Sequence, residues 1–426
     1  MKLLYLLLIT TQIYSQINWV SFNTSNSNIP YNQVNSIEFG SSFNSSGDIF
    51  VGTSFGLGIL NIDNANFANN TWSTFNEVPD PNTGLIGNEI INIQKNNSGD
   101  MWICTTNGIS ILEYNSSIVD TTNENWEYYN TDNSSIPSNM AKSILFDESN
   151  KIWIGTTSGL AIIENDSWNV QTFETEGIYS NNIKKIIQNP SDQKIYLGTL
   201  NGGLYTWENN EFYYWNNTNS GLIDNTINDF IFDSNNNLII TSPSAGLEVQ
   251  TSEGNWLQFN TSTNPELPFF INSLQNVIID NNNNLWISTM ENGLIKYVDN
   301  NWTFYNEENS GLPDDKINCL KYDNINNTLW IGTDTQGIVM LDLNTLNNFE
   351  GLEEFNFNPY FIDDFLNLNL EDSGLISIYN ISGNLMFQSL KNKSEKSVRT
   401  NKLKAGNYII TFKNKRKKIS ALITKQ

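Results

Sequence analysis

Short stretches in which apolar and polar residues alternate recur along most of the chain, and turns rich in Asn, Asp, Gly and Ser separate them. In the clearest stretch, residues 151–156, alternation places Trp153 and Gly155 on one side of an extended strand and Ile154 on the other. Both sides therefore have something to bury. Three more strand-length segments surround it, at residues 141–147, 159–163 and 168–173. The pattern predicts a unit of four short antiparallel strands.

This unit occurs seven times. The second strands of the copies begin at Phe50, Trp102, Trp153, Tyr196, Ile239, Trp286 and Trp330. They follow one another at intervals of 43 to 52 residues, a spacing typical of propeller blades. The third residue of each strand is Gly or another small residue, as a crowded sheet interface requires, except for Thr241 in a degenerate fifth copy. We predict an all-β chain in which residues 17–350 form a seven-bladed β-propeller.

A glycine opens the third strand of every copy, where a tight hairpin needs a positive φ angle. These glycines are Gly56, Gly108, Gly159, Gly203, Gly246, Gly293 and Gly337.

The order of the strands predicts how the ring closes. Aromatic residues mark the fourth strands, and the first such pair, Trp19 and Phe22, precedes any first strand. Nothing comparable follows the seventh copy. We therefore expect residues 17–23 to pair with the strand near residues 337–343 and complete the last sheet.

The Trp-Ile-Gly-Thr strand followed by Gly-Leu or Gly-Ile resembles the two-component regulator propeller repeats of periplasmic sensor regions in Bacteroidetes hybrid regulators. The resemblance covers residues 17–350. In that family a membrane span and a histidine kinase follow the propellers, and we expect neither in this chain.

Both ends of the chain carry export signals. Residues 1–16 combine Lys2, an apolar stretch at residues 3–9 and a small residue, Ser15, which is typical of a secretory signal peptide. No later segment is apolar for long enough to predict a transmembrane helix.

After residue 350 the repeat stops, and alternating strands with Gly-containing turns predict a small β-sandwich at residues 351–426. The segments 358–359, 376–383 and 403–408, with the terminal Lys425, resemble a type A sorting domain of type IX secretion. The resemblance implies that the secretion machinery is a partner, and that the protein is secreted or carried to the cell surface.

The charge of the chain argues against nucleic acid as a partner. The net charge is −23, and residues 1–390 carry ten basic against forty-four acidic residues, so this part of the chain repels phosphate backbones. The chain has no histidine, which excludes His-dependent triads and His-containing zinc sites. Streptogramin-type lyases depend on histidine and are disfavoured. Cys104 and Cys319 lie in units that are not neighbours, so we expect two buried thiols without a disulfide.

Two other patterns bear on ligand binding. Asn-rich turns such as residues 280–284 are compatible with calcium, but Asn and Asp also suit such hairpins. We predict no metal site and no cofactor. A polar residue also recurs just before each first strand, where it can form a ligand ring or, as we favour, fix the loop: Asn32, Asn88, Asn139, Asn181, Asn225, Asn272 and Asp315.

Residues that vary at equivalent turns are better ligand candidates, because a repeated scaffold does not require them. In the hairpins after the second strands, near the expected mouth of the central channel, the predicted ligand-binding residues are Phe55, Asn107, Asn201, Glu291, Asp334 and Gln336. Aromatic and amide groups together suit sugar rings. We expect a non-catalytic binding or scaffold propeller that recognises polysaccharide or glycoprotein, the ligand class that the resemblance implies. The alternatives are a carbohydrate-active enzyme that uses carboxylates on the same face and a protein-binding adhesin.

Overall fold

The computed structural model describes residues 19–40, 47–62, 70–114, 125–172, 180–265, 267–346, 360–362, 364–368, 373–380, 385–404, 406–413 and 418–425. The predicted signal peptide lies outside these residues. The chain divides into two compact units, residues 1–346 and 347–426.

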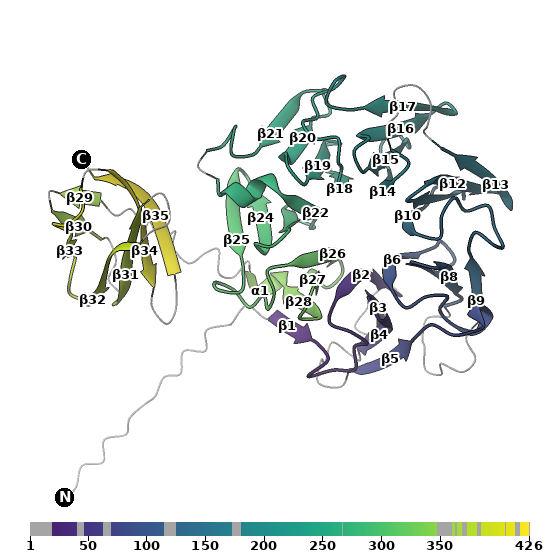
Figure 1. Ribbon diagram of the computed structural model, residues 1–426, viewed down its shortest axis with the longest axis horizontal. Helices are drawn as coiled ribbons and strands as arrows, with labels where there is room; N and C mark the ends of the chain where they lie inside the picture. The colour runs from purple at the N-terminus through teal and green to yellow at the C-terminus, as the bar shows by residue number, and fades with distance from the viewer. Residues whose placement is uncertain are drawn as a thin grey trace, which may run out of the picture. The chain divides into compact units, whose positions relative to one another are not determined.

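The first unit is a seven-bladed propeller, as predicted (Figure 1). Blade one contains β2 (Val34–Phe39), β3 (Gly47–Thr53), β4 (Gly56–Ile62) and β5 (Thr71–Phe75). Blade two contains β6 (Ile90–Lys95), β7 (Met101–Thr105), β8 (Gly108–Leu112) and β9 (Trp126–Tyr129). Blade three contains β10 (Ala141–Phe146), β11 (Ile152–Thr156), β12 (Gly159–Glu164) and β13 (Ser167–Gln171). Blade four contains β14 (Ile183–Gln188), β15 (Ile195–Thr199), β16 (Leu204–Glu208) and β17 (Glu211–Trp215).

The remaining blades follow the same plan. Blade five contains β18 (Asp229–Phe232), β19 (Leu238–Ser242), β20 (Gly246–Gln250) and β21 (Trp256–Phe259). Blade six contains β22 (Leu274–Ile279), β23 (Leu285–Thr289), β24 (Leu294–Val298) and β25 (Asn301–Tyr305). Blade seven contains β26 (Ile317–Asp323), β27 (Thr328–Thr333), β28 (Ile338–Asp342) and β1 (Trp19–Phe22). Within the described residues, three helical turns interrupt the strands: η2 (Pro81–Thr83), η3 (Phe269–Asn272) and α1 (Leu343–Leu346).

The N-terminal strand closes the ring. β1 pairs antiparallel with β28, and the register places Trp19 opposite Leu341 and Phe22 opposite Ile338. Figure 1 shows the two strands side by side at the outer edge of the last blade. The predicted closure is therefore confirmed, and the blade in which the two ends of the propeller meet is a full four-stranded sheet.

Each blade buries both of its faces. Trp153 packs in an apolar cluster shared with blade four, whereas Ile154 packs in a cluster shared with blade two. Gly155 has no room for a side chain, because an added Cβ would lie 2.6 Å from Cγ2 of Ile183. The small residue of the second strand is thus required by contact with the next blade.

The hairpin glycines have the predicted conformation. The φ angle is positive at all seven glycines and ranges from +81° at Gly293 to +143° at Gly108. In six blades the last Thr of the second strand donates a hydrogen bond to the carbonyl oxygen of this glycine, as Thr53 does to Gly56 at 2.7 Å. Blade five departs from this rule. There Ser242 donates to the carboxylate of Glu248 instead.

The second unit is a small β-sandwich of two sheets. The strands of one sheet, in spatial order, are β29 (Tyr360–Ile362), β30 (Phe365–Asn367) and β33 (Ser397–Arg399). Those of the other are β32 (Leu385–Lys391), β31 (Gly374–Asn380), β34 (Gly406–Lys413) and β35 (Lys418–Lys425). The core between them includes Leu366, Ile376 and Phe412. The Nζ of Lys425 is buried and donates to the carbonyl oxygens of Thr400 and Leu403.

Cys104 and Cys319 are free thiols. Cys104 is buried as expected, whereas Cys319 is half-buried, and burial raises the pKa of both thiols. Over the described parts of the chain, no helix has the length and apolar character needed to cross a bilayer.

Candidate functional site

One face of the propeller brings together two sets of connections. They are the loops that lead into each first strand and the hairpins between second and third strands, and we call this side the turn face. Backbone hydrogen bonds join the two sets: the N–H of Gly56 donates to the carbonyl oxygen of Asn88, and that of Gly337 to Asn32. The hairpin of one blade thus contacts the loop that enters the next.

Exposed apolar side chains gather on the turn face. In the described part of the propeller, seven large apolar residues are exposed there: Tyr31, Phe55, Met140, Leu200, Ile223, Phe269 and Met290. On the opposite face, the described residues include one member of this set, Ile325, and the outer strands expose Val170, Tyr213 and Leu257. Exposed apolar groups concentrated on one face are typical of an interaction surface.

Phe55 is the aromatic member of the predicted ligand-binding residues. Its side chain is 60% exposed and lies against Tyr31, with ring centroids 5.1 Å apart and the planes tilted by 49°. The pair offers aromatic surface to solvent on the turn face.

Asp334 is held by three donors. Its carboxylate accepts hydrogen bonds from Gln33 at 2.9 Å, Lys316 at 3.0 Å and Asn318 at 3.4 Å. Partial burial alone would raise the pKa of Asp334, but the hydrogen bonds and the charge of Lys316 outweigh burial and lower the pKa. A carboxyl group with a lowered pKa is ionised at neutral pH and is unsuited to the role of general acid in glycoside hydrolysis.

The other predicted residues are spread around the ring. Asn107 donates to the carbonyl oxygen of Ile86, and Asn201 accepts from Thr226 at 2.7 Å. Gln336 and Glu291 lie in the hairpins of blades seven and six. The structure does not gather these side chains into one cluster, and their role in ligand binding stays a prediction.

The polar residue before each first strand fixes its loop. In six blades its side-chain oxygen accepts a hydrogen bond from a backbone N–H eight or eleven residues earlier. The acceptors are Asn32, Asn88, Asn139, Asn225, Asn272 and Asp315, at 2.7 to 2.9 Å. The structural role that we favoured for this position is confirmed in those blades.

The Asn-rich hairpins also use their oxygens internally. Oδ1 of Asp280 accepts the backbone N–H groups of Asn282 and Asn284, and Oδ2 accepts the indole N–H of Trp286 at 2.9 Å. No group of three or more Cys, Asp or Glu side chains suited to a metal ion occurs within the residues described.

A central cavity of roughly 580 Å³ is lined by first-strand residues from all seven blades. Figure 1 shows β2, β6, β10, β14, β18, β22 and β26 around the axis of the ring. Of the predicted ligand-binding residues, none belongs to the cavity wall, but Asp334 is bonded to Asn318, which does. This hydrogen bond links the cavity wall to the turn face.

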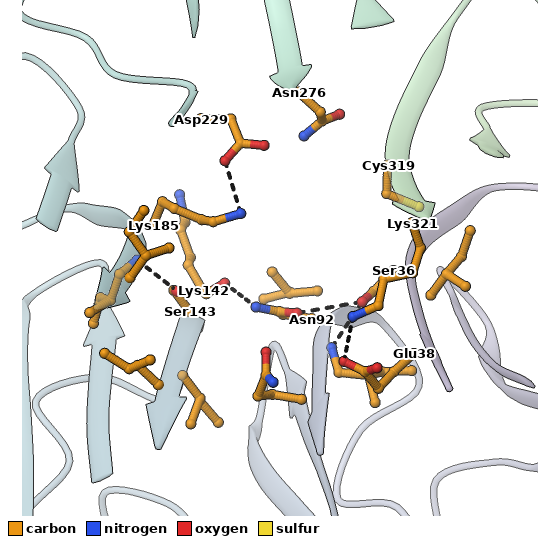
Figure 2. Close-up of a pocket in the computed structure, with 18 of the residues that line it drawn as sticks. Ser36, Glu38, Asn92, Lys142, Ser143, Lys185, Asp229, Asn276, Cys319 and Lys321 are labelled. Carbon is orange, nitrogen blue, oxygen red and sulfur yellow. Dashed lines mark hydrogen bonds and ion pairs between the residues drawn. The ribbon is translucent and has the colours of Figure 1, made fainter. Parts of the chain in front are cut away.

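Polar contacts between blades encircle the cavity (Figure 2). Small or acidic side chains of blades one, three and five accept a backbone N–H from the next blade. The pairs are Ser36 with Ile93, Ser143 with Ile186 and Asp229 with Val277. Two ion pairs also cross between blades, Lys185 with Asp229 at 2.9 Å and Lys321 with Glu38 at 2.8 Å.

These cavity lysines were missed by sequence reasoning. A signal was present, because residues 17–346 contain nine lysines and no arginine, and several of the lysines fall on first strands. Without knowing that first strands line the axis, nothing distinguished Lys142 or Lys184 from exposed strand residues.

Comparison with known proteins identifies the second unit. Residues 358–426 match the secretion system C-terminal sorting domain. The tail implies interaction with the type IX secretion machinery, and the protein is exported, either to the cell surface or beyond it. No curated protein matches the chain.

Solved structures share the propeller fold. The extracellular domain of a putative hybrid two-component system from B. thetaiotaomicron is similar with a TM-score of 0.60 and 18% identity, over 95% of this chain and 57% of that one. PorZ, an essential surface component of the type IX secretion system of Porphyromonas gingivalis, gives a TM-score of 0.57 and 15% identity, over 95% and 60%. The chain spans about three fifths of the length of these proteins.

Virginiamycin B lyase from Staphylococcus aureus is also similar, with a TM-score of 0.55 and 12% identity over 76% of this chain and 99% of the lyase. A histidine-to-alanine variant of that lyase is catalytically inactive. Because this chain contains no histidine, the similarity extends to the fold and not to that catalytic group.

Proposed function

We propose that the protein is a non-catalytic binding propeller whose turn face docks polysaccharide or a glycoprotein outside the cell. The observation that carries this proposal is the concentration of exposed apolar side chains on that face. An export signal explains where such a surface acts, and a rigid ring of seven blades explains how it is presented.

The aromatic pair on blade one favours a sugar ligand. An aromatic ring buries the apolar face of a pyranose, while neighbouring polar groups bond its hydroxyls. Phe55 and Tyr31 supply the first kind of group. Asn107 of blade two and Asp334 and Gln336 of blade seven, on the hairpins of the two adjacent blades, supply the second, whereas Asn201 and Glu291 lie farther around the same face.

Binding of the purified full chain to a glycan panel and to isolated envelope glycoproteins tests this proposal. Phe55→Ala should weaken binding at least tenfold, because it removes the stacking surface. Ile325→Ala is the matched control, since Ile325 is comparably exposed on the opposite face. Capture of an unglycosylated envelope protein, with no glycan bound, would favour the adhesin instead.

The catalytic alternative is tested with the same material. If a bound glycan is cleaved, and Glu291→Gln or Asp334→Asn abolishes cleavage while binding is retained, the protein is an enzyme and the proposal is wrong. Binding without turnover supports it.

A further inference from the structure

The central cavity concentrates positive charge within an acidic protein. Five of the nine lysines of residues 17–346 line it: Lys95, Lys142, Lys184, Lys185 and Lys321. The acidic residues in the cavity wall are Glu38 and Asp229. Five lysines against two carboxylates give the cavity wall a net formal charge of +3, in a chain whose net charge is −23.

Two of the five lysines are neutralised by carboxylates. Lys185 pairs with Asp229 and Lys321 with Glu38 (Figure 2), and both acids are almost completely buried. Lys95 lies apart, with its Nζ on the carbonyl oxygen of Gly40 at 3.1 Å. Lys142 and Lys184 remain.

Lys142 and Lys184 lie on the adjacent strands β10 and β14. The Nζ of Lys184 donates to Oδ1 of Asn228, and among the described residues the Nζ of Lys142 has no hydrogen-bond or ion-pair partner. Burial lowers the pKa of both ammonium groups, and the charge of Lys142 lowers that of Lys184 further, against weaker opposing effects of Asp229 and Asp224. The arrangement holds two partly desolvated cations close enough to repel each other.

The propeller does not need lysine at these positions. Both residues occupy a bulge that recurs in first strands, between Ala141 and Ser143 in β10 and between Ile183 and Lys185 in β14. Other blades place neutral residues at the same bulge: Asn35, Ile91, Gln275 and Asn318. Because the repeat folds with neutral residues at this position, folding does not require the two positive charges, and they indicate another role.

We propose that the central cavity is an anion site in which Lys142 and Lys184 hold a carboxylate, sulfate or phosphate group that arrives from the turn face. Lys142 follows Met140 of that face by two residues, so the site lies near the rim. A cavity of roughly 580 Å³ accommodates one acidic sugar unit or a free oxyanion with its water. Amide donors of the wall, Asn92 and Asn276 among them, complete the surroundings (Figure 2). The inference goes beyond the proposed function, since it does not depend on what the turn face docks.

Calorimetric titration of the full chain tests this site, with sodium sulfate, sodium phosphate and sodium D-glucuronate as probes and glucose as the neutral control. Chloride keeps the ionic strength constant, so that screening does not imitate binding. We expect saturable binding of at least one anion and a rise in Tm that grows with the logarithm of the anion concentration above the Kd. Absence of saturable binding by all three anions would overturn the proposal.

Neutral variants assign the site to the two lysines. Lys142→Met/Lys184→Met should weaken anion binding at least tenfold. Either single variant should weaken it severalfold, and the single variants serve as the test if the double variant does not fold. Lys151→Met is the control, because it removes a lysine that pairs with Glu164 outside the cavity. Unchanged affinity in the Lys142 and Lys184 variants, or an equal loss in Lys151→Met, contradicts the assignment. Tighter binding of glucuronate than of sulfate and phosphate identifies an acidic sugar as the source, and the reverse order identifies a free oxyanion.

Discussion

The Nζ of Lys321 lies 2.8 Å from Oε2 of Glu38, although 283 positions separate the two residues along the chain. The pair joins blade seven to blade one, and we call the boundary between these two blades the seam. Like the β1–β28 pairing within blade seven, it ties the N-terminal part of the propeller to the C-terminal part. Gln33 and Asp334 make a second contact across this seam, at 2.9 Å. The ring is therefore fastened at its inner wall and at its turn face, as well as at its outer edge.

The seam ion pair should contribute measurably to stability. Glu38 is almost fully buried, so Glu38→Gln should lower the free energy of unfolding by about 1–2 kcal/mol, because it leaves Lys321 without its counter-charge. A double-mutant cycle with Lys321→Met, measured by urea unfolding, gives the coupling energy. The pair Lys151–Glu164, whose carboxylate is exposed, is the control, with an expected coupling below about 0.5 kcal/mol. Equal coupling in the two pairs would contradict a special role for the seam.

Gly337 should tolerate no side chain. Its φ angle is +82°, and an added Cβ would lie 2.1 Å from the carbonyl oxygen of Phe22 in the closing strand. Gly337→Ala should therefore destabilise the propeller several times more than Gly254→Ala. Gly254 has a similar φ of +88° but open space around it, so its substitution introduces only backbone strain of about 1 kcal/mol. Thermal unfolding of both variants measures this difference. Similar decreases in Tm would show that backbone strain, and not the clash with Phe22, accounts for the destabilisation.

Blade two can be stabilised by giving the hairpin between its first and second strands the polar residues of the equivalent hairpin in blade six. The indole N–H of Trp102 is buried without a partner, whereas Trp286 donates to Asp280. The residues of blade two equivalent to Asp280 and Asn284 are Asn96 and Asp100, which stand in the exchanged order.

Asn96→Asp/Asp100→Asn should raise the free energy of unfolding by about 1 kcal/mol, because the new carboxylate can accept the indole N–H. Asn96→Asp alone should destabilise the protein, since it places two carboxylates side by side. Chemical denaturation of the three variants is the measurement, and a stabilising single variant would refute this reading of the hairpin.

Glu248 should make stability depend on pH. Burial raises its pKa above the ordinary value near 4.5, although hydrogen bonds from Ile223 and Ser242 oppose the shift. Because the folded protein keeps this proton to a higher pH than the unfolded chain, the stabilisation is complete below pH 4.5 and is lost as the pH rises through the folded pKa.

Glu248→Gln should abolish this loss, since the amide stays neutral: its oxygen can accept from Ile223, and its NH2 group can donate to Oγ of Ser242. Free energies of unfolding between pH 4.5 and 8 should thus fall more steeply for the natural protein than for the variant. Glu253→Gln, at an exposed site on the same blade, should leave the slope unchanged. Parallel slopes for all three proteins would exclude Glu248 as the cause.

The fold could be predicted from the sequence because its determinants are local and repeated. Gly56 and its six equivalents report a turn conformation that no other residue adopts easily, and the position of Trp19 reports which strand is left over to close the ring. Each of these signals involves only a few neighbouring residues.

The candidate site was less accessible, because it depends on contacts between blades. The sequence does not show that Asp334 accepts from Gln33 on the far side of the seam, or that Lys142 and Lys184 approach each other across β10 and β14. The bulge that turns both lysines toward the axis is also invisible in the alternation of polar and apolar residues. Blade five shows the same limit. Thr241 marks this blade as unusual in the sequence, but only the packed structure shows that Ser242 donates to Glu248 and not to the glycine carbonyl.

The pairing of β1 with β28 has a consequence for biogenesis. Residues 19–22 precede their partners, residues 338–341, by almost the whole length of the propeller, so this pairing has the longest sequence separation of the propeller's strand pairs. It cannot form until both segments have been made. Until then the nascent chain carries an unpaired strand at one end and an uncovered sheet edge at the other, both of which invite aggregation. A product that terminates before residue 338 cannot complete the ring and should be a substrate for periplasmic chaperones and proteases.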